Sequence, residues 1–356
     1  MRVVDADGKP APHVEVGVFG ATWSSSKGEY PPPRNRKHRT DDHGILKLES
    51  VRECDWPTFF YAYDEARHLA GFCLVERLDG LARPQAVLLK PARWVTGRIV
   101  STEANARGWS ADIICASLTP IKDARRRGRW LRFVTSPSRP FRFLVPAGDY
   151  GLRLYGYPRT KHVVIEIRVL PGSTPLDLGT YDLPLSRLAR LTGQPAPEWD
   201  VMEWSDGKAR TLAGLRGRPV LLCFWQKNSA PANALRRVFD LHGRLRDTDV
   251  VMLLIHAPEP GGPAAVQRYL DENVRSDTLA AGLELDVGKW PFPSAVDRPA
   301  RSGASYPWGF PLGQSQEPYG EIACPTFILI DRGGTIVADS HMRAEDWDAA
   351  LAKIAK

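Results

Sequence analysis

The chain has 356 residues, a hydrophobic share of 43% and five cysteines without any C-x-x-C pattern. This length predicts two or three domains, each able to bury its own core without disulfide staples, and no apolar run is long enough to form a transmembrane segment. The cysteines show no zinc motif and the eight histidines no metal-ligand spacing, so we expect neither a metal nor another cofactor.

The net charge of +7 belongs to the N-terminal half of the chain. Residues 1–184 carry 28 Lys and Arg against 20 Asp and Glu, whereas residues 185–356 carry 20 against 21. The densest basic segments, 34–39 and 125–129, indicate either an anionic or cell-surface ligand or simply solvated loops. No recognition helix or RNA-binding signature accompanies them, so we expect no nucleic-acid partner.

Residues 1–91 have the period of β-strands. Valines alternate with other residues over 14–18, which is typical of a half-buried strand. The segments 5–10 and 40–44 contain Asp-Gly and Asp-His-Gly, which suit the turns between antiparallel strands. We therefore expect an all-β module over residues 1–91.

Residues 92–184 repeat this organisation. Strands are predicted at 94–101 and 111–118, and the phrase Val-Pro-Ala-Gly-Asp-Tyr over 145–150 introduces the next one. The turn phrases of both segments resemble the carboxypeptidase-regulatory-like (transthyretin-like) β-sandwich. This resemblance implies two Ig/transthyretin-like sandwich modules, 1–91 and 92–184, that act as spacers or binding platforms.

Three tryptophans leave a ligand surface open as an alternative for the sandwich modules. Trp94, Trp109 and Trp130 are large aromatic residues of the kind that bind carbohydrate or cell-surface polymers. Tryptophan is also a common core residue of β-sandwiches. The two interpretations stay open from the sequence.

The segment 184–200 is predicted to be a linker into a third domain over 185–356. The first hairpin of this domain is expected at 201–204 and 209–212. A continuous apolar run over 220–225 predicts a central strand that is buried on both faces.

The elements that follow alternate between helix and strand, which predicts an α/β domain. Apolar residues recur with helical spacing after position 229, and the run at 250–255 is a second central strand. Helical patterns also cover 264–274 and 344–355, and strands are predicted at 325–331 and 335–338. Asp297 and Asp331 suit strand-end and turn roles better than an acid/base pair.

Three phrases of residues 190–356 occur in the order found in the redoxin superfamily. They are Gly-Gln-Pro-Ala-Pro over 193–197, Val-Leu-Leu-Cys-Phe-Trp over 220–225, and Tyr-Gly-Glu-Ile-Ala-Cys-Pro-Thr-Phe-Ile-Leu-Ile-Asp over 319–331. The segment resembles TlpA-like and ResA-like disulfide reductases and AhpC/TSA-like peroxiredoxins. The resemblance implies a multidomain chain whose last domain has a thioredoxin-like fold, with a cis peptide bond before Pro325.

The resemblance also implies that the catalytic cysteine pair has been lost. Ser229 and Ala232 occupy the two cysteine positions of this degenerate motif, and Trp225, Pro231 and Pro325 are the site-shaping residues. Disulfide exchange needs an attacking thiolate and a second thiol to resolve the intermediate. We therefore predict a redox-inactive binding or assembly protein, with a protein or peptide partner at the redoxin site.

Cys324 is the basis of the alternative function. It precedes Pro325, and in this fold that position borders the missing thiol pair, so a single-cysteine peroxidase or thiol oxidoreductase is the rival hypothesis. A lone cysteine is more often a small buried apolar residue, which we expect for Cys223. Whether the chain is an enzyme stays open from the sequence.

Two further expectations concern the insertion and the location. Residues 275–318 depart from the family pattern and are rich in aromatic residues and proline, which predicts either an ordered flap near the site or a loop over an edge strand. The chain enters a strand pattern at Met1 without a secretory leader. We expect that an upstream leader segment was trimmed or missed from this chain, and that the protein is extracytoplasmic, in the periplasm or cell envelope, with the cytoplasm as the alternative.

Overall fold

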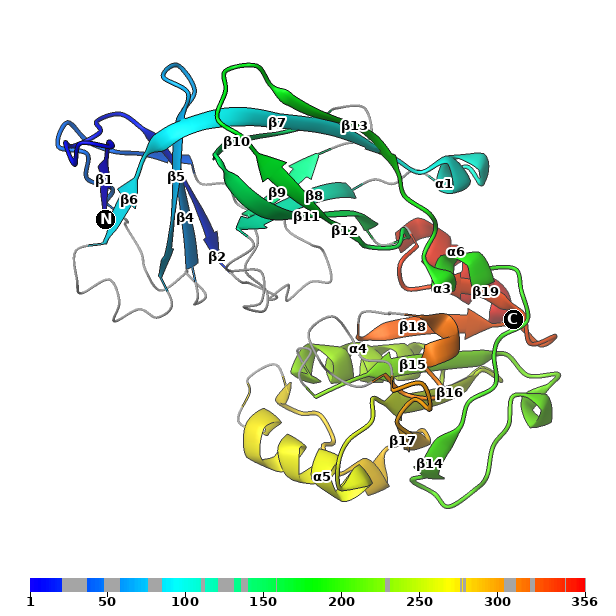
Figure 1. Cartoon of the computed structure of the whole chain (residues 1–356). Coiled ribbons are helices and arrows are strands. Elements are labelled where there is room, and N and C mark those ends of the chain that lie inside the picture. Colours follow the sequence, from blue (N-terminus) through cyan, green and yellow to red (C-terminus); the bar gives the residue numbers. More distant parts are fainter. Residues whose placement is uncertain are drawn as a thin grey trace. The chain divides into compact units, whose positions relative to one another are not determined.

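The computed structural model places most of the chain in two compact units, Met1–Leu185 and Ser186–Lys356 (Figure 1). The boundary between them lies one residue beyond the predicted boundary at 184. The structure describes residues 1–20, 37–47, 58–75, 85–109, 113–120, 131–135, 140–157, 159–227, 231–275, 277, 280–303, 312–320, 324–342 and 344–355.

The first unit is mostly β-structure, as the alternating patterns predict. One short helix, α1 (Thr102–Ala106), begins at Ser101, whose hydroxyl accepts from the Ala104 backbone N–H. The strands are β1 (Arg2–Val4), β2 (Glu15–Gly20), β3 (Lys37–Arg39), β4 (Thr58–Asp64), β5 (Leu69–Val75), β6 (Ala86–Leu88), β7 (Lys90–Val100), β8 (Ile113–Pro120), β9 (Leu131–Thr135), β10 (Phe141–Pro146), β11 (Gly148–Tyr157), β12 (Val163–Val169) and β13 (Leu176–Asp182).

The long strand β7 connects the two predicted sandwich modules (Figure 1). Its first residues pair with β5, and the rest pairs with β10 and, in parallel, with β13. Among the described residues this sheet has the order β10-β7-β5-β4-β2-β3, beside a sheet β12-β11-β8-β9 and the pair β1-β6. Because β7 passes through residue 91, both predicted modules contribute to one sheet, and their separation at that residue stays a prediction.

Aromatic packing continues across the same position. The hydroxyl of Tyr61 on β4 donates to the Leu144 carbonyl on β10 at 2.7 Å, and Tyr61 belongs to one buried cluster with Val95 and Phe143. Gly97 lies opposite Phe141, whose ring comes within 2.4 Å of the point where a Cβ of residue 97 would be. Only glycine leaves room for that ring against β7.

The second unit is an α/β layer structure. Its sheet has the order β14-β17-β16-β15-β18-β19, in which β15, β16 and β17 are parallel. The elements are α3 (Arg187–Leu191), β14 (Val201–Trp204), the 3-10 turn η2 (Ala213–Leu215), β15 (Val220–Trp225), α4 (Pro231–Leu245), β16 (Val251–His256), α5 (Gly262–Tyr269), the π-turn η3 (Leu270–Val274), the 3-10 turn η5 (Val287–Lys289), β17 (Ser294–Asp297), the 3-10 turn η6 (Glu317–Tyr319), β18 (Thr326–Ile330), β19 (Ile336–Asp339) and α6 (Ala344–Ile354).

The alternation of side chains along β15 divides the core of this unit into two clusters. Leu221, Cys223 and Trp225 face a cluster that includes residues of α4, α5 and α6. Val220, Leu222 and Phe224 belong to the second cluster, with Leu188 and Trp199. All six residues of β15 are buried, as expected for a central strand with both faces covered.

Two predictions about this unit are corrected. The predicted linker contains helix α3, capped by Ser186 and anchored by the buried Leu188, so it is part of the domain. Residues 209–212 do not form a strand, because β14 pairs with β17 instead. The described part of the insertion 275–318 supplies β17 to the sheet, and its predicted role as a flap or as a loop over an edge strand stays a prediction.

Candidate functional site

The segment that is predicted to be a degenerate redoxin motif joins β15 to α4. Trp225 ends β15 with 1% of its surface exposed, and Pro231 begins α4, where its missing N–H costs no helical hydrogen bond. Ala232 is buried in the same cluster as Trp225. Ser229 lies outside the described residues. At the position predicted to correspond to the second cysteine, a methyl group is therefore packed into the core.

His256 fixes the start of this turn. The Lys227 backbone N–H donates to His256 Nε2 at 3.0 Å, and His256 Nδ1 lies 2.6 Å from the Ala257 carbonyl. Since Nε2 accepts a hydrogen bond, the proton of the neutral ring is on Nδ1, where it donates to that carbonyl. Burial lowers the pKa of His256 to about 4, which keeps the ring neutral near pH 7.

A partly buried ion pair holds the same turn from its other side. Lys227 Nζ lies 2.8 Å from Glu259 Oε1, and the ammonium also lies 5.4 Å from the centre of the Tyr269 ring. Trp225 contacts the edge of the His256 ring at a centroid distance of 4.6 Å. The backbone that leads to the motif is thus held by fixed polar and aromatic contacts.

Cys324 and Pro325 approach the same end of β15. The Cys324–Pro325 peptide bond is cis, and the next residue, Thr326, pairs with Phe224 in the sheet. Cys324 is half-buried, and Gln316 Nε2 lies 3.7 Å from its Sγ. Cys223 is completely buried, and burial raises the pKa of its thiol well above the usual range.

Asp297 anchors the loop that contributes Gln316. Its carboxylate accepts from the Ser315 backbone N–H at 3.0 Å and from the Gln316 N–H at 3.2 Å, and all three residues are fully buried. Burial raises the pKa of Asp297 to about 6 against the opposing effect of these hydrogen bonds. A Cβ at Gly313 would lie 1.8 Å from Oδ2 of Asp297, so glycine is required there.

Sequence reasoning missed a pocket of about 240 Å³ at the carboxyl ends of β15 and β16. Trp225 and His256 line it together with residues from β14, α5 and β17. Ligands of open α/β sheets bind at this edge. No sequence signal marks the pocket, because its walls come from separate segments and one of them, β17, was not predicted. The other lining residues are Glu203, Trp204, Ser205, Pro263, Val266, Val287, Ser294, Ala295 and Val296.

The predicted tryptophan surface of the first unit takes a different form. The Arg142 guanidinium lies 4.2 Å from the centre of the Trp94 ring, and that of Arg159 lies 4.1 Å from the centre of the Trp109 ring. These cations occupy ring faces that a sugar would otherwise stack on. Trp130 lies outside the described residues. A shallow pocket of about 170 Å³ is lined by Tyr61, Tyr63, Glu65, Trp94, Arg142 and Leu144.

In the part of the chain that the structure describes, no group of three or more His, Cys, Asp or Glu side chains could hold a metal ion. None of the helices in the described ranges has the length and apolar character needed to cross a bilayer.

Comparisons with known proteins find similarity over less than half of the chain. No family model and no curated protein matches the chain. One similar solved structure is a thioredoxin domain of a Bacteroides vulgatus thiol-disulfide oxidoreductase, with 17% identity and a TM-score of 0.32 over 46% of this chain and 98% of that one. Another is a Corynebacterium glutamicum thiol-disulfide isomerase, with 20% identity and a TM-score of 0.33 over 46% of this chain and 96% of that one. A third is an exposed lipoprotein thioredoxin of Streptococcus pneumoniae, with 24% identity and a TM-score of 0.30 over 44% of this chain and 98% of that one. The order β15-α4-β16 followed by β18-β19-α6 in residues 186–356 is that of a thioredoxin-like fold.

Proposed function

We propose that the thioredoxin-like domain is a binding or assembly module that does not exchange disulfides, and that it works outside the cytoplasm. The observation that carries this proposal is the buried Ala232 in the first turn of α4. A thiol at this position would have to resolve the mixed disulfide of any exchange reaction. A methyl group cannot accept or release a sulfur, and the chain has no C-x-x-C elsewhere.

The surroundings of the motif support a binding role. A redox-active turn must present an exposed thiolate. Here the backbone before α4 is fixed by the hydrogen bond from the Lys227 N–H to His256 and by the Lys227–Glu259 ion pair. Such contacts fix the backbone in one geometry, which lowers the entropy lost when a partner binds. A protein or peptide partner at the end of β15 would meet a preorganised surface.

Insulin reduction tests the proposal directly. With dithiothreitol as the electron source, the purified chain should leave the rate of insulin precipitation at the rate of dithiothreitol alone, because it lacks a dithiol that can cycle. The Ala232→Ser variant serves as a control for small changes at this position and should behave in the same way. Catalysis by the wild-type chain would contradict the proposal.

A second candidate function rests on Gln316. Its amide donates toward Cys324 Sγ at 3.7 Å, and a donor aimed at sulfur favours the thiolate over the thiol. Because Cys324 is half-buried, a small oxidant can reach it. We propose single-thiol chemistry at Cys324 as the alternative to a purely binding role.

Alkylation kinetics decide between the two functions. Under the binding hypothesis, iodoacetamide should modify Cys324 with an apparent pKa at or above about 8.5, the value of a free thiol, and peroxide consumption should match the Cys324→Ser variant. Gln316→Leu removes the donor and is the matched variant. An apparent pKa well below that value, which rises in Gln316→Leu, together with peroxide turnover, would establish the alternative.

A further inference from the structure

Strand β12 forms one edge of the sheet β12-β11-β8-β9 in the first unit. It pairs with β11 from Val163 to Val169, without a bulge. No other strand in the described ranges pairs with it, so its second edge presents backbone N–H and C=O groups that can pair with another chain. Native proteins often protect such an edge with a proline or a bulge. β12 contains neither, since Pro171 follows the end of the strand.

The corresponding edge of the sheet in the second unit is covered by the chain itself. β19 forms that edge, and the Gly193 N–H donates to the Ile336 carbonyl at 2.8 Å. The Ile336 N–H donates in turn to the Gln194 carbonyl at 2.9 Å. Residues 193 and 194 thus occupy backbone groups of β19, whereas β12 has no comparable cover among the described residues.

The outward face of β12 carries exposed apolar residues and one charge of each sign. Val164 is 55% exposed, and Leu170, directly after the strand, is 58% exposed. Glu166 has no ion-pair or hydrogen-bond partner within the described part of the chain. Arg168 Nε lies 2.7 Å from Asp149 Oδ1, and its Nη2 lies 3.4 Å from Oδ2, so Nη1 can still donate to another carboxylate.

These residues complement a second copy of the same strand. In an antiparallel pair of β12 strands centred on Ile167, each Glu166 lies opposite Arg168 of the second copy. Val164 then lies opposite Leu170 of the second copy, on both sides of the two-fold axis. Opposite charges and apolar pairs at such positions stabilise a sheet. A register shifted by two residues would place Glu166 opposite Glu166, or Arg168 opposite Arg168, so the charges select a single register.

We propose that two copies of this chain associate through β12, antiparallel and centred on Ile167, so that their sheets become one continuous sheet. The Arg168 guanidinium then lies between Asp149 of its own chain and Glu166 of the second copy. Two strands of this length bury less surface than a permanent dimer needs, so the dimer is reversible and depends on concentration. The contact involves the first unit alone, so it holds whether or not the second unit exchanges disulfides.

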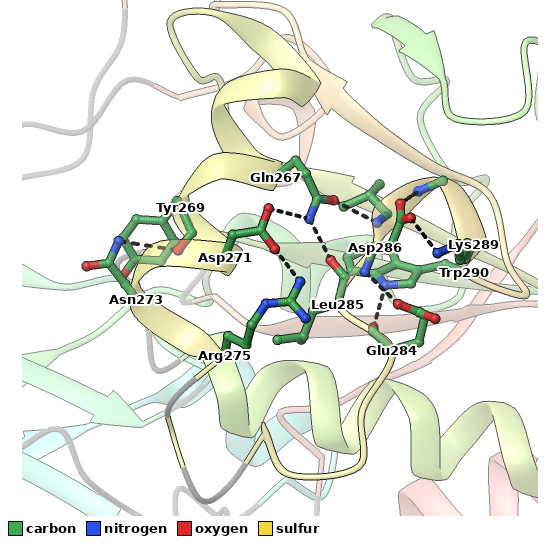
Figure 2. Close-up of polar contacts among 12 residues, drawn as sticks. Gln267, Tyr269, Asp271, Asn273, Arg275, Glu284, Leu285, Asp286, Lys289 and Trp290 are labelled. Carbon is green, nitrogen blue, oxygen red and sulfur yellow. Dashed lines mark hydrogen bonds and ion pairs between the residues drawn. The ribbon is translucent and has the colours of Figure 1, made fainter.

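A matched control pair of charges lies in the segment that follows α5 (Figure 2). Asp271 and Arg275 form an exposed ion pair, and Gln267 Nε2 also donates to Asp271 at 3.2 Å. Both charges thus have partners within one chain. Reversing either of them changes the net charge as much as reversing Glu166 or Arg168 does, but leaves β12 unaltered.

Sedimentation equilibrium of the full chain over a rising concentration series tests the proposal. The wild-type chain should approach the mass of a dimer. Glu166→Arg and Arg168→Glu should each weaken self-association about 5-fold or more, because both charged cross-strand pairs of the dimer become repulsive. An equimolar mixture of these two variants should associate about as tightly as the wild-type chain, since opposite charges face each other again. Asp271→Arg, Arg275→Glu and their mixture should all behave like the wild-type chain.

Cysteine pairing tests the register. Val164→Cys and Leu170→Cys chains, mixed and oxidised, should form a disulfide between positions 164 and 170, identified by peptide mapping because the chain has five cysteines of its own. Neither variant should link to itself, because its two new thiols would lie about 20 Å apart in this register.

Three results would overturn the proposal. The first is a wild-type chain that stays monomeric at every concentration. The second is a mixture of Glu166→Arg and Arg168→Glu that associates no better than either variant alone. The third is a disulfide between two copies of Val164→Cys, or between two copies of Leu170→Cys, in place of the mixed one.

Discussion

Lowering the pH from 7.5 to 5.0 should cost the second unit about 2 kcal/mol of unfolding free energy through His256 alone, and about 3 kcal/mol by pH 4. Burial lowers the pKa of His256 to about 4, from an ordinary value of 6.5. Between pH 6.5 and about 4, the imidazole of residue 256 is therefore mostly protonated in the unfolded chain and mostly neutral in the folded chain. The stabilising contribution is complete above pH 6.5 and is lost as the pH falls toward 4.

Urea unfolding of the wild-type chain and of His256→Gln at both pH values isolates this contribution. Gln can still accept from the Lys227 N–H but does not titrate, so the variant should be less pH-dependent than the wild type by about 2 kcal/mol over this range. The comparison cancels the carboxylates that titrate in both proteins. Equal pH dependence of the two proteins would show that His256 is not the buried neutral group described here.

Asp297→Ala should lower the free energy of unfolding of the second unit by about 2 to 6 kcal/mol at pH 7.5. The substitution removes the acceptor of the Ser315 and Gln316 backbone N–H groups, both in fully buried residues. Each buried N–H group left without an acceptor lowers the free energy of unfolding by about 1 to 3 kcal/mol. The loop 312–320 would lose its anchor, and Gln316 its fixed position beside Cys324.

Asp297→Asn is the matched control for this prediction. It keeps one oxygen that can accept from the two N–H groups, so its loss should be clearly smaller than that of Asp297→Ala when both are measured by urea unfolding. A loss within about 0.5 kcal/mol of zero for Asp297→Ala, the usual range for surface substitutions, would contradict the assigned role. So would equal losses for the two variants.

The elements with the strongest hydrophobic patterns could be predicted from the sequence. The continuous apolar run over 220–225 is β15 without a shift, and the run at 250–255 is β16 displaced by one residue. The predicted helix over 264–274 divides into α5 and a π-turn. Long runs of this kind determine burial on both faces of a strand or along one face of a helix, and burial decides the element.

The site was only partly predictable, because its decisive contacts join distant segments. Trp225, Pro231 and Ala232 follow from one local phrase, but His256 is a single histidine at the end of an apolar run, without a local signal. The four residues of β17 are too few to show a period, so the pairing of β14 with β17 was missed and with it the pocket. The predicted strand-end position of Asp297 is confirmed, since β17 ends there. Its buried hydrogen bonds to Ser315 and Gln316 could not be predicted from the sequence.

The double variant Ser229→Cys/Ala232→Cys tests most directly whether the redoxin motif lies at the start of α4. We expect air oxidation to link positions 229 and 232 in one peptide-mapped disulfide, and the reduced variant to accelerate insulin reduction above the rate with the wild-type chain. Two free thiols at these positions after oxidation, or no gain in insulin reduction, would contradict the claim that this turn is a thioredoxin-type site without its cysteines.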